Sequence, residues 1–180
     1  MPGVSDLGER AAAGGLLLRS LTLTDVPALA SLMARNREHI GRYMRAPSEV
    51  AGDLVRLLCS TLAAEQRGEV ITVVVEADST LAGLFTLVPM STPVAGHEYI
   101  GWVGTEYVRR GAGQACLTWL CGLAQDQGID VVHARIRSDN APMNALARAA
   151  GFVPVEPIAS MGNSDDATWW LLRRDAATDS

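Results

Sequence analysis

The stretch from His97 to Leu123 limits the possible folds most strongly, because the hydrophobic period changes within it. His97–Val103 has the length and composition of a β-strand. Beyond this strand, apolar side chains recur at the spacing of one helix face, at Ala112, Cys116, Trp119, Leu120 and Leu123. The sequence therefore predicts a strand that leads through a short glycine-containing turn into an amphipathic helix.

The turn between this strand and this helix predicts an anion-binding site. The first N–H groups of a helix have no partner within it, and the aligned peptide dipoles place partial positive charge there. Gly111 and Gly113 carry no Cβ, so the backbone can close around a diphosphate, and two arginines add fixed positive charge. A Gly-x-Gly turn with two arginines is also typical of an ordinary solvated loop. The candidate contact residues are Arg109, Arg110, Gly111, Ala112, Gly113, Gln114 and Ala115.

The same kinds of pattern predict the other elements of the chain. Further strands are expected at Leu16–Leu23, Val70–Ala77, Leu81–Val88, Ile129–Ile136, Phe152–Ile158 and Ala167–Arg173. Further helices are expected at Thr24–Asn36, at Arg37–Met44, from Ser48 to Gly68, and at Asn140–Ala150. This order predicts a single α/β domain over residues 16–180, with about seven strands in a mixed sheet and helices on both faces. Residues 1–15 are small, polar and glycine-containing, which predicts a flexible N-terminal tail.

Composition excludes several classes of function. A length of 180 residues with 48% hydrophobic residues suits one globular domain. The net charge of −5 gives no indication of nucleic-acid binding and favours a cationic partner such as an amine. Three cysteines are too few for a metal site or a disulfide framework, so no metal is expected. No apolar stretch approaches the roughly 20 residues of a membrane span, and no signal peptide is recognisable, so we expect a cytoplasmic protein without a membrane partner.

Beyond the amphipathic helix, a strand, Ser138-Asp139-Asn140, a second helix and Gly151-Phe152 follow in that order. This arrangement resembles the coenzyme-binding half of the GNAT superfamily of N-acetyltransferases, and most resembles its ribosomal-protein alanine/serine (RimJ/RimL-like) branch. The opening strand and acceptor-side helices of that branch are similar to Leu18-Arg19 with Asp25, and to Asn36-Arg37-Glu38-His39.

The resemblance implies a GNAT-like fold with a mostly antiparallel sheet, and acetyl-CoA as co-substrate. It implies that the strand Glu98–Val103 holds the pantetheine arm by backbone bonds, at Trp102 and Val103, and that the turn from residue 109 to residue 115 holds the pyrophosphate. Asn140 stands eleven positions before Gly151, which matches the asparagine-to-Gly-Phe spacing of the family. Asn140 and Met143 are the further coenzyme contacts that the resemblance implies.

The chain departs from the family pattern where a general acid is usual. Many members have a tyrosine where this chain has Ala147, and the ribosomal branch tends to have a serine where this chain has Met143. A separate departure concerns the coenzyme loop, which in the family usually starts with Gln or Arg where this chain has Val108. A general acid or base contributes about 10²–10⁴-fold, so its loss slows transfer without abolishing it. An α-amine is roughly a tenth neutral at pH 7, whereas a lysine amine is below about a thousandth. The missing acid therefore favours an α-amine acceptor.

Glu98 and Glu156 are the candidate general bases. Glu98 is the first candidate, because it lies on the strand that would border the thioester. Glu156, between Pro154 and Pro157, would line the acceptor cleft, and either carboxylate could act through a water molecule. Glu106 is expected on a loop surface.

Three functions stay open at this point. The first is acetyl transfer to a protein N-terminal α-amine, and the second is transfer to a small amine such as an antibiotic, a polyamine or an aminoacyl metabolite. The third is a catalytically silent module that binds acyl-CoA, which the missing acid favours. A dinucleotide-binding loop agrees less well with the incomplete glycine pattern. The sequence is compatible with a monomer or a homodimer.

Overall fold

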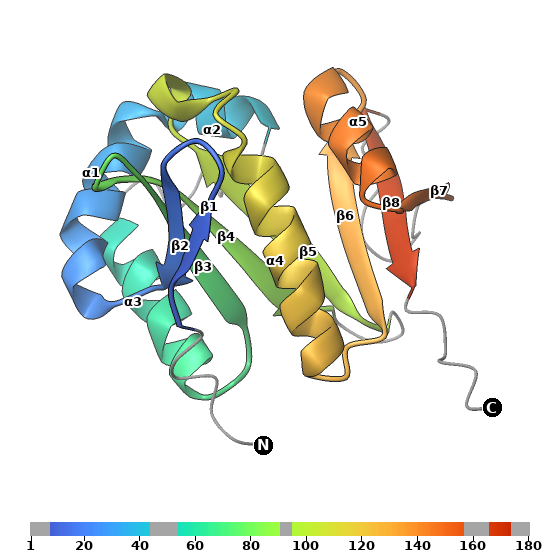
Figure 1. The fold of residues 1–180 in the computed structure, drawn as a ribbon, viewed down its shortest axis with the longest axis horizontal. Helices are drawn as coiled ribbons and strands as arrows, with labels where there is room; N and C mark the ends of the chain where they lie inside the picture. Colours follow the sequence, from blue (N-terminus) through green and yellow to red (C-terminus); the bar gives the residue numbers. More distant parts are fainter. Residues whose placement is uncertain (1–7, 44–53, 91–94, 157–165, 174–180) are drawn as a thin grey trace.

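The computed structural model of the chain describes residues 8–43, 54–90, 95–156 and 166–173 (Figure 1). The strands are β1 (Arg10–Ala12), β2 (Leu16–Ser20), β3 (Ile71–Ala77), β4 (Thr80–Pro89), β5 (His97–Val103), β6 (Val131–Arg137), β7 (Val153–Val155) and β8 (Ala167–Arg173). The α-helices are α1 (Val26–Arg35), α2 (Arg37–Tyr43), α3 (Leu54–Gln66), α4 (Ala112–Asp126) and α5 (Ala141–Ala149), and Leu23–Asp25 (η1) and Thr105–Tyr107 (η2) are short 3-10 helices.

The strands form one sheet in the order β1-β2-β3-β4-β5-β6-β8-β7. All neighbours are antiparallel except β5 and β6, which are parallel. This arrangement confirms the expected mixed α/β sheet that is mostly antiparallel, with eight strands in the described residues instead of about seven. The hairpin expected around Asp78-Ser79 is present, because both residues adopt a positive φ that closes a tight turn between β3 and β4.

The additional strand lies in the range that the sequence assigns to a flexible tail. Arg10–Ala12 pair antiparallel with the start of β2. Gly14 and Gly15, with φ of 80° and 72°, turn the chain back on itself, and only glycine adopts this backbone without strain. In the sequence these glycines favour a loose terminus, whereas in the structure they form the turn of a hairpin. The expected helix cap at Ser48 lies outside the described residues.

Helices cover both faces of the sheet, as expected (Figure 1). Val73, Val74 and Val75 of β3 are each 0% exposed, although successive side chains of a strand point to opposite faces. Val73 and Val75 pack in the cluster of α4 and α5, and Val74 packs in the cluster of α1 and α3. The sheet is therefore buried on both sides, and β5 lies between the two sets of helices.

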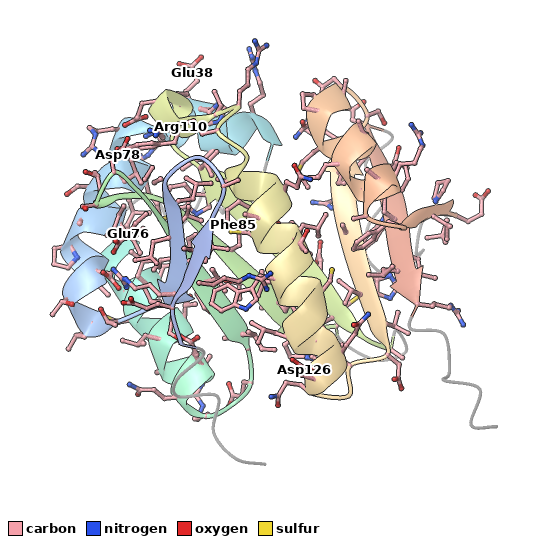
Figure 2. All side chains as sticks on the ribbon, viewed as in Figure 1. Glu38, Glu76, Asp78, Phe85, Arg110 and Asp126 are labelled. Atoms are coloured by element: carbon pink, nitrogen blue, oxygen red, sulfur yellow. The ribbon has the colours of Figure 1, made fainter. Side chains whose placement is uncertain are left out.

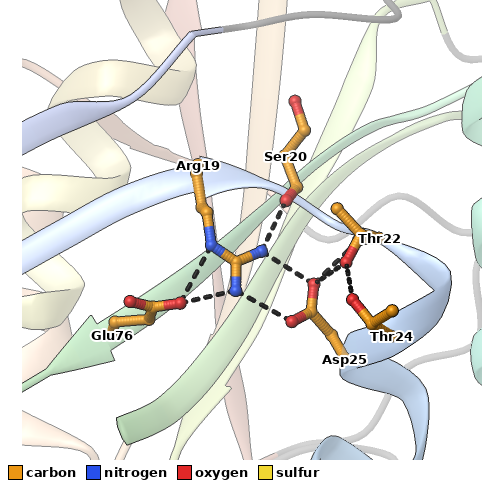
Figure 3. Close-up of polar contacts among 6 residues, drawn as sticks. All are labelled: Arg19, Ser20, Thr22, Thr24, Asp25 and Glu76. Carbon is orange, nitrogen blue, oxygen red and sulfur yellow. Dashed lines mark hydrogen bonds and ion pairs between the residues drawn. The ribbon is translucent and has the colours of Figure 1, made fainter. Parts of the chain in front are cut away.

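A charged cluster joins β2, the start of α1 and β3 (Figure 3). Arg19 donates to both carboxylate oxygens of Asp25, at 2.7 and 2.8 Å, and its Nε donates to Glu76 at 2.9 Å. The N–H and the hydroxyl of Thr22 also donate to Asp25, at 2.8 and 2.7 Å. Burial disfavours the Asp25 carboxylate, but the bonds from Arg19 and Thr22 outweigh it and lower its pKa. The cluster fixes the direction in which the chain enters α1.

The described part of the chain holds no group of three or more His, Cys, Asp and Glu side chains that could bind a metal ion. Cys116 is buried, Cys59 and Cys121 are partly buried, and all three are free thiols. Among the described helices, none has the length and apolarity needed to cross a membrane.

Candidate active site

Strands β5 and β6 are neighbours in the sheet but pair over one short step. His97 lies opposite Val132 and Glu98 lies opposite His133, and the described pairing ends there. By contrast, β5 pairs with β4 along its whole length, and so does β6 with β8. On its β6 side, β5 therefore has no strand partner among the described residues beyond Glu98. An extended ligand can bond to the backbone of this edge, which includes Trp102 and Val103.

The β5–α4 loop (residues 104–111) leads from this edge to an uncapped helix start. Gly111 is the N-cap residue of α4, with φ of 84° and no side-chain cap bond. Arg109 also has a positive φ, of 64°, which is uncommon for a residue with a side chain. The N–H of Ala115 donates to the carbonyl of Gly111 at 3.0 Å, but the N–H groups of residues 109–114 have no acceptor in the described chain. These groups and the helix dipole form a site for an anion.

The two arginines of this loop differ in their surroundings. The guanidinium of Arg110 donates to Asp78, in the β3–β4 turn, at 2.8 Å (Figure 2). Arg109 is exposed, and no described acidic side chain pairs with it. A Cβ on Gly14 would lie 3.4 Å from the carbonyl oxygen of Arg110, so the β1–β2 turn also packs closely against the loop. Of the two loop arginines, Arg109 is therefore the stronger candidate for a side-chain contact with an anion.

Helix α5 lies against the first turn of α4. A Cβ on Gly113 would lie 3.6 Å from Leu146 and 3.8 Å from the sulfur of Met143. The N–H of Met143 donates to Oδ1 of Asn140 at 3.3 Å, so Asn140 caps α5 as a helix N-cap residue. The structure therefore places Met143 beside the α4 turn, whereas Asn140 is shown only as the cap of α5. Ala147 is 1% exposed and packs in the core, so this position supplies no acid.

Glu98 lies on the sheet face opposite α4 and α5. Its neighbour Tyr99 packs in the cluster of α4, and alternation along the strand points Glu98 to the other face. Burial raises the pKa of the Glu98 carboxyl, and the cation of Arg135 on β6 opposes this shift in part. His133, opposite Glu98, is buried, and its Nε2 lies 3.0 Å from the carbonyl oxygen of Ala95.

The other two carboxylates lie elsewhere. Glu156 is exposed and follows β7, at the edge of the sheet. Three interstrand steps separate β7 from β5, or roughly 14 Å at the usual strand spacing. The described structure thus does not bring Glu156 and Glu98 together. Glu106 is exposed on η2, where one of its carboxylate oxygens lies 3.2 Å from the hydroxyl oxygen of Thr105.

The sequence model of the family described as acetyltransferase (GNAT) domain matches residues 15–153. This match covers more than half of the chain. The chain belongs to the GNAT acetyltransferase family. It follows that acetyl-CoA is the co-substrate of this GNAT protein, and the resemblance drawn from the β5–α4 loop is confirmed. A search of curated proteins finds no significant match.

Several solved structures share the fold of this GNAT protein. The ribosomal L7/L12 alpha-N-protein acetyltransferase RimL, in complex with coenzyme A, is similar with a TM-score of 0.79 and 19% identity, over 94% of this chain and 99% of that chain. Mycobacterium smegmatis RimJ, in complex with a CoA-disulfide, is similar with a TM-score of 0.75 and 16% identity, over 98% of this chain and 90% of that chain. The microcin C7 self immunity acetyltransferase MccE, in complex with acetyl-CoA and AMP, is similar with a TM-score of 0.72 and 18% identity, over 89% of this chain and 93% of that chain. These similarities confirm the GNAT-like fold.

Two residues of this GNAT site had no signal in the sequence analysis. The hydroxyl of Tyr99 donates to the carbonyl of Gly113 at 3.4 Å, and its ring stacks on Phe85 with centroids 5.7 Å apart. Gly101 leaves room for the Phe85 ring, because a Cβ at position 101 would overlap that ring. Asp78, which pairs with Arg110, is the second. Neither contact follows from a local sequence pattern, because Tyr99 meets Gly113 across 14 positions and Asp78 meets Arg110 across 32.

Proposed function

We propose that this GNAT protein acetylates a protein N-terminal α-amine, with Glu98 as the base that accepts the amine proton. The position of Glu98, at the last paired step of β5 and β6, carries the proposal. A coenzyme whose diphosphate lies on the α4 turn can extend its arm along the open edge of β5 toward this step. The acceptor amine then approaches from the opposite sheet face, where Glu98 points.

The chemistry requires one proton acceptor on that face. The neutral amine nitrogen attacks the carbonyl carbon of the thioester, the carbon–sulfur bond breaks, and coenzyme A leaves as the thiolate. The amine proton passes to the Glu98 carboxylate, directly or through a water molecule. Burial raises the pKa of Glu98, which makes its ionised form a stronger proton acceptor than an exposed carboxylate.

An α-amine is favoured over lysine because the described site lacks the usual acid. Ala147 is buried, and Met143 packs near Gly113. A site with one carboxylate suits an amine that is already partly neutral near pH 7. The similarity to RimL, a ribosomal L7/L12 alpha-N-protein acetyltransferase, supports transfer to a protein α-amine. The similarity to MccE, which is in complex with acetyl-CoA and AMP, supports transfer to a small-molecule amine as the second candidate.

Thiol release from acetyl-CoA, measured with a panel of peptides and a panel of small amines, tests the acceptor. Turnover of peptides with free N-termini, but not of the same peptides with blocked N-termini, is expected. Turnover of small amines alone would support the second candidate. Tight binding of acetyl-CoA without turnover of any acceptor would support a silent binding module.

Glu98→Gln tests the base. The variant should lose about 10²–10⁴-fold in kcat, as expected for removal of a general base. Wild-type kcat should rise with pH through a pKa above the ordinary Glu value of 4.5, and the variant should lose this limb. Glu156→Gln tests the second carboxylate in the same assay. A larger loss of kcat in Glu156→Gln than in Glu98→Gln would identify Glu156, at the edge of the sheet, as the base.

A further inference from the structure

Asn36 is a buried polar residue at the junction of α1 and α2, and it is 4% exposed. Its N–H donates to the carbonyls of Leu32 and Met33 at the end of α1, at 3.1 and 3.2 Å. Its carbonyl accepts from the N–H of Ile40 in α2, at 2.8 Å. The backbone of this one residue therefore belongs to both helices.

The side chain of Asn36 reaches the β5–α4 loop, 69 positions along the chain. Oδ1 accepts from both the N–H and the hydroxyl of Thr105, each at 2.8 Å. Nδ2 donates to the carbonyl of Leu32 at 3.0 Å, which holds the amide in this orientation. Buried polar atoms without partners are costly, so these bonds define one position of the loop against α1.

The loop has little freedom between this contact and the anion site. A Cβ on Gly104 would lie 3.1 Å from Leu32 and 3.2 Å from Nδ2 of Asn36, so the loop approaches α1 as closely as a glycine allows. The N–H of Tyr107 donates to the carbonyl of Gly104 at 2.9 Å, which closes a turn directly after the contact. Arg109 follows two residues later, so a shift at Thr105 is passed on to the uncapped start of α4.

We propose that Asn36 is a positioning residue for acetyl-CoA, which it serves by holding the β5–α4 loop against the α1–α2 junction. The inference rests on the proposed function only in that it assigns the α4 turn to the diphosphate of the coenzyme. In this role Asn36 acts through the loop and not by its own contact with the coenzyme. It sets the place of the N–H groups that bind the diphosphate.

Calorimetric binding of acetyl-CoA and steady-state kinetics of Asn36→Ala, Thr105→Val and Thr105→Ser test the proposal. Misplacement of a binding loop by about 1 Å can cost up to about 100-fold, so Asn36→Ala should raise both Kd and KM for acetyl-CoA about tenfold. Thr105→Val loses one of the two bonds to Oδ1 and should raise both constants about threefold. Thr105→Ser keeps both bonds and should match the wild type. The matched control is Thr61→Val, which removes a hydroxyl bonded to the Leu57 carbonyl within α3, far from the loop in sequence.

A merely structural role would give a different result. Partial unfolding lowers the concentration of active protein and hence the apparent kcat, but it leaves Kd and KM of the folded fraction unchanged. This outcome in Asn36→Ala, or an unchanged Kd in Thr105→Val, overturns the proposal. If Asn36→Ala does not fold, the two Thr105 variants decide. If the wild type binds acetyl-CoA but acetylates no acceptor, the proposed function fails while the calorimetric result still decides the role of Asn36.

Discussion

Helices α4 and α5 start side by side on the same face of the sheet, but their N-termini are built differently. The start of α5 is capped, because Oδ1 of Asn140 accepts from the N–H of Met143. The side chain of Asn144 also donates back to the carbonyls of Asn140 and Arg137, at 3.0 and 2.8 Å. The start of α4 has a glycine with positive φ and no side-chain bond.

The difference marks the start of α4, and not that of α5, as the proposed anion site. A side-chain cap contributes about 1 kcal/mol to stability and occupies the donors at the helix end. At α4 those donors stay open, and the chain forgoes this stabilisation. The proposed coenzyme site is therefore marked by backbone N–H groups that make no hydrogen bond within the described residues. Four predictions, ordered from the largest expected effect to the smallest, test this difference between the two helix starts.

Gly111→Glu should have the largest effect. A carboxylate at the open start of α4 opposes the diphosphate, and the positive φ adds backbone strain, so Kd for acetyl-CoA should rise at least about 100-fold. Gly128→Glu is the matched control, because Gly128 has φ of 71° and equally open space at the other end of α4. That end, marked by Asp126, lies far from Arg110 (Figure 2). Isothermal titration measures both variants, and equal affinities would contradict an anion site at Gly111.

Arg109→Gln and Arg110→Gln should differ from each other. Arg109 has no described acidic partner, so its loss should raise Kd about tenfold, or about 1.4 kcal/mol. Arg110 is already paired with Asp78, so its loss should raise Kd only about twofold. The same titration compares them. If Arg110→Gln weakens binding more than Arg109→Gln, the diphosphate recruits Arg110 away from its acidic partner.

Asn140→Ala should act mainly on stability. Loss of the α5 cap should lower the free energy of unfolding by about 1 kcal/mol, measured with urea, while Kd for acetyl-CoA changes less than about threefold. Asn140→Asp keeps a capping oxygen and should restore the stability. A tenfold loss of affinity in Asn140→Ala would show that both helix starts serve the coenzyme.

Asp78→Asn should have the smallest effect. The change releases the Arg110 guanidinium toward the anion site, so Kd for acetyl-CoA should fall about twofold. Asp78 has φ of 52°, a backbone that asparagine tolerates, and the side chain is 72% exposed. The free energy of unfolding should therefore change by less than about 0.5 kcal/mol. Weaker binding would mean that Asp78 places Arg110 for the coenzyme.

Short-range patterns predicted most of the elements. The β-branched run of β3, the turn at Asp78-Ser79 and the helical period of α4 each depend on residues close in sequence, and all three are present as expected. The strand β1 was missed because alanines and glycines carry little strand propensity, and it forms by pairing with β2. The position of Glu156 could not be predicted either. Its neighbouring prolines favoured a place in the acceptor cleft, whereas its position at the edge of the sheet depends on the strand order.

The turn at Asp78-Ser79 and the open start of α4 could be predicted from the sequence alone, because turn residues, hydrophobic period and capping side chains act between near neighbours. The acidic partner of Arg110 and the contact that holds the β5–α4 loop depend on the tertiary structure. Arg110 meets Asp78 across 32 positions, and Asn36 meets Thr105 across 69. Such pairs arise from the strand order and from the packing of helices on both faces, which no local pattern encodes.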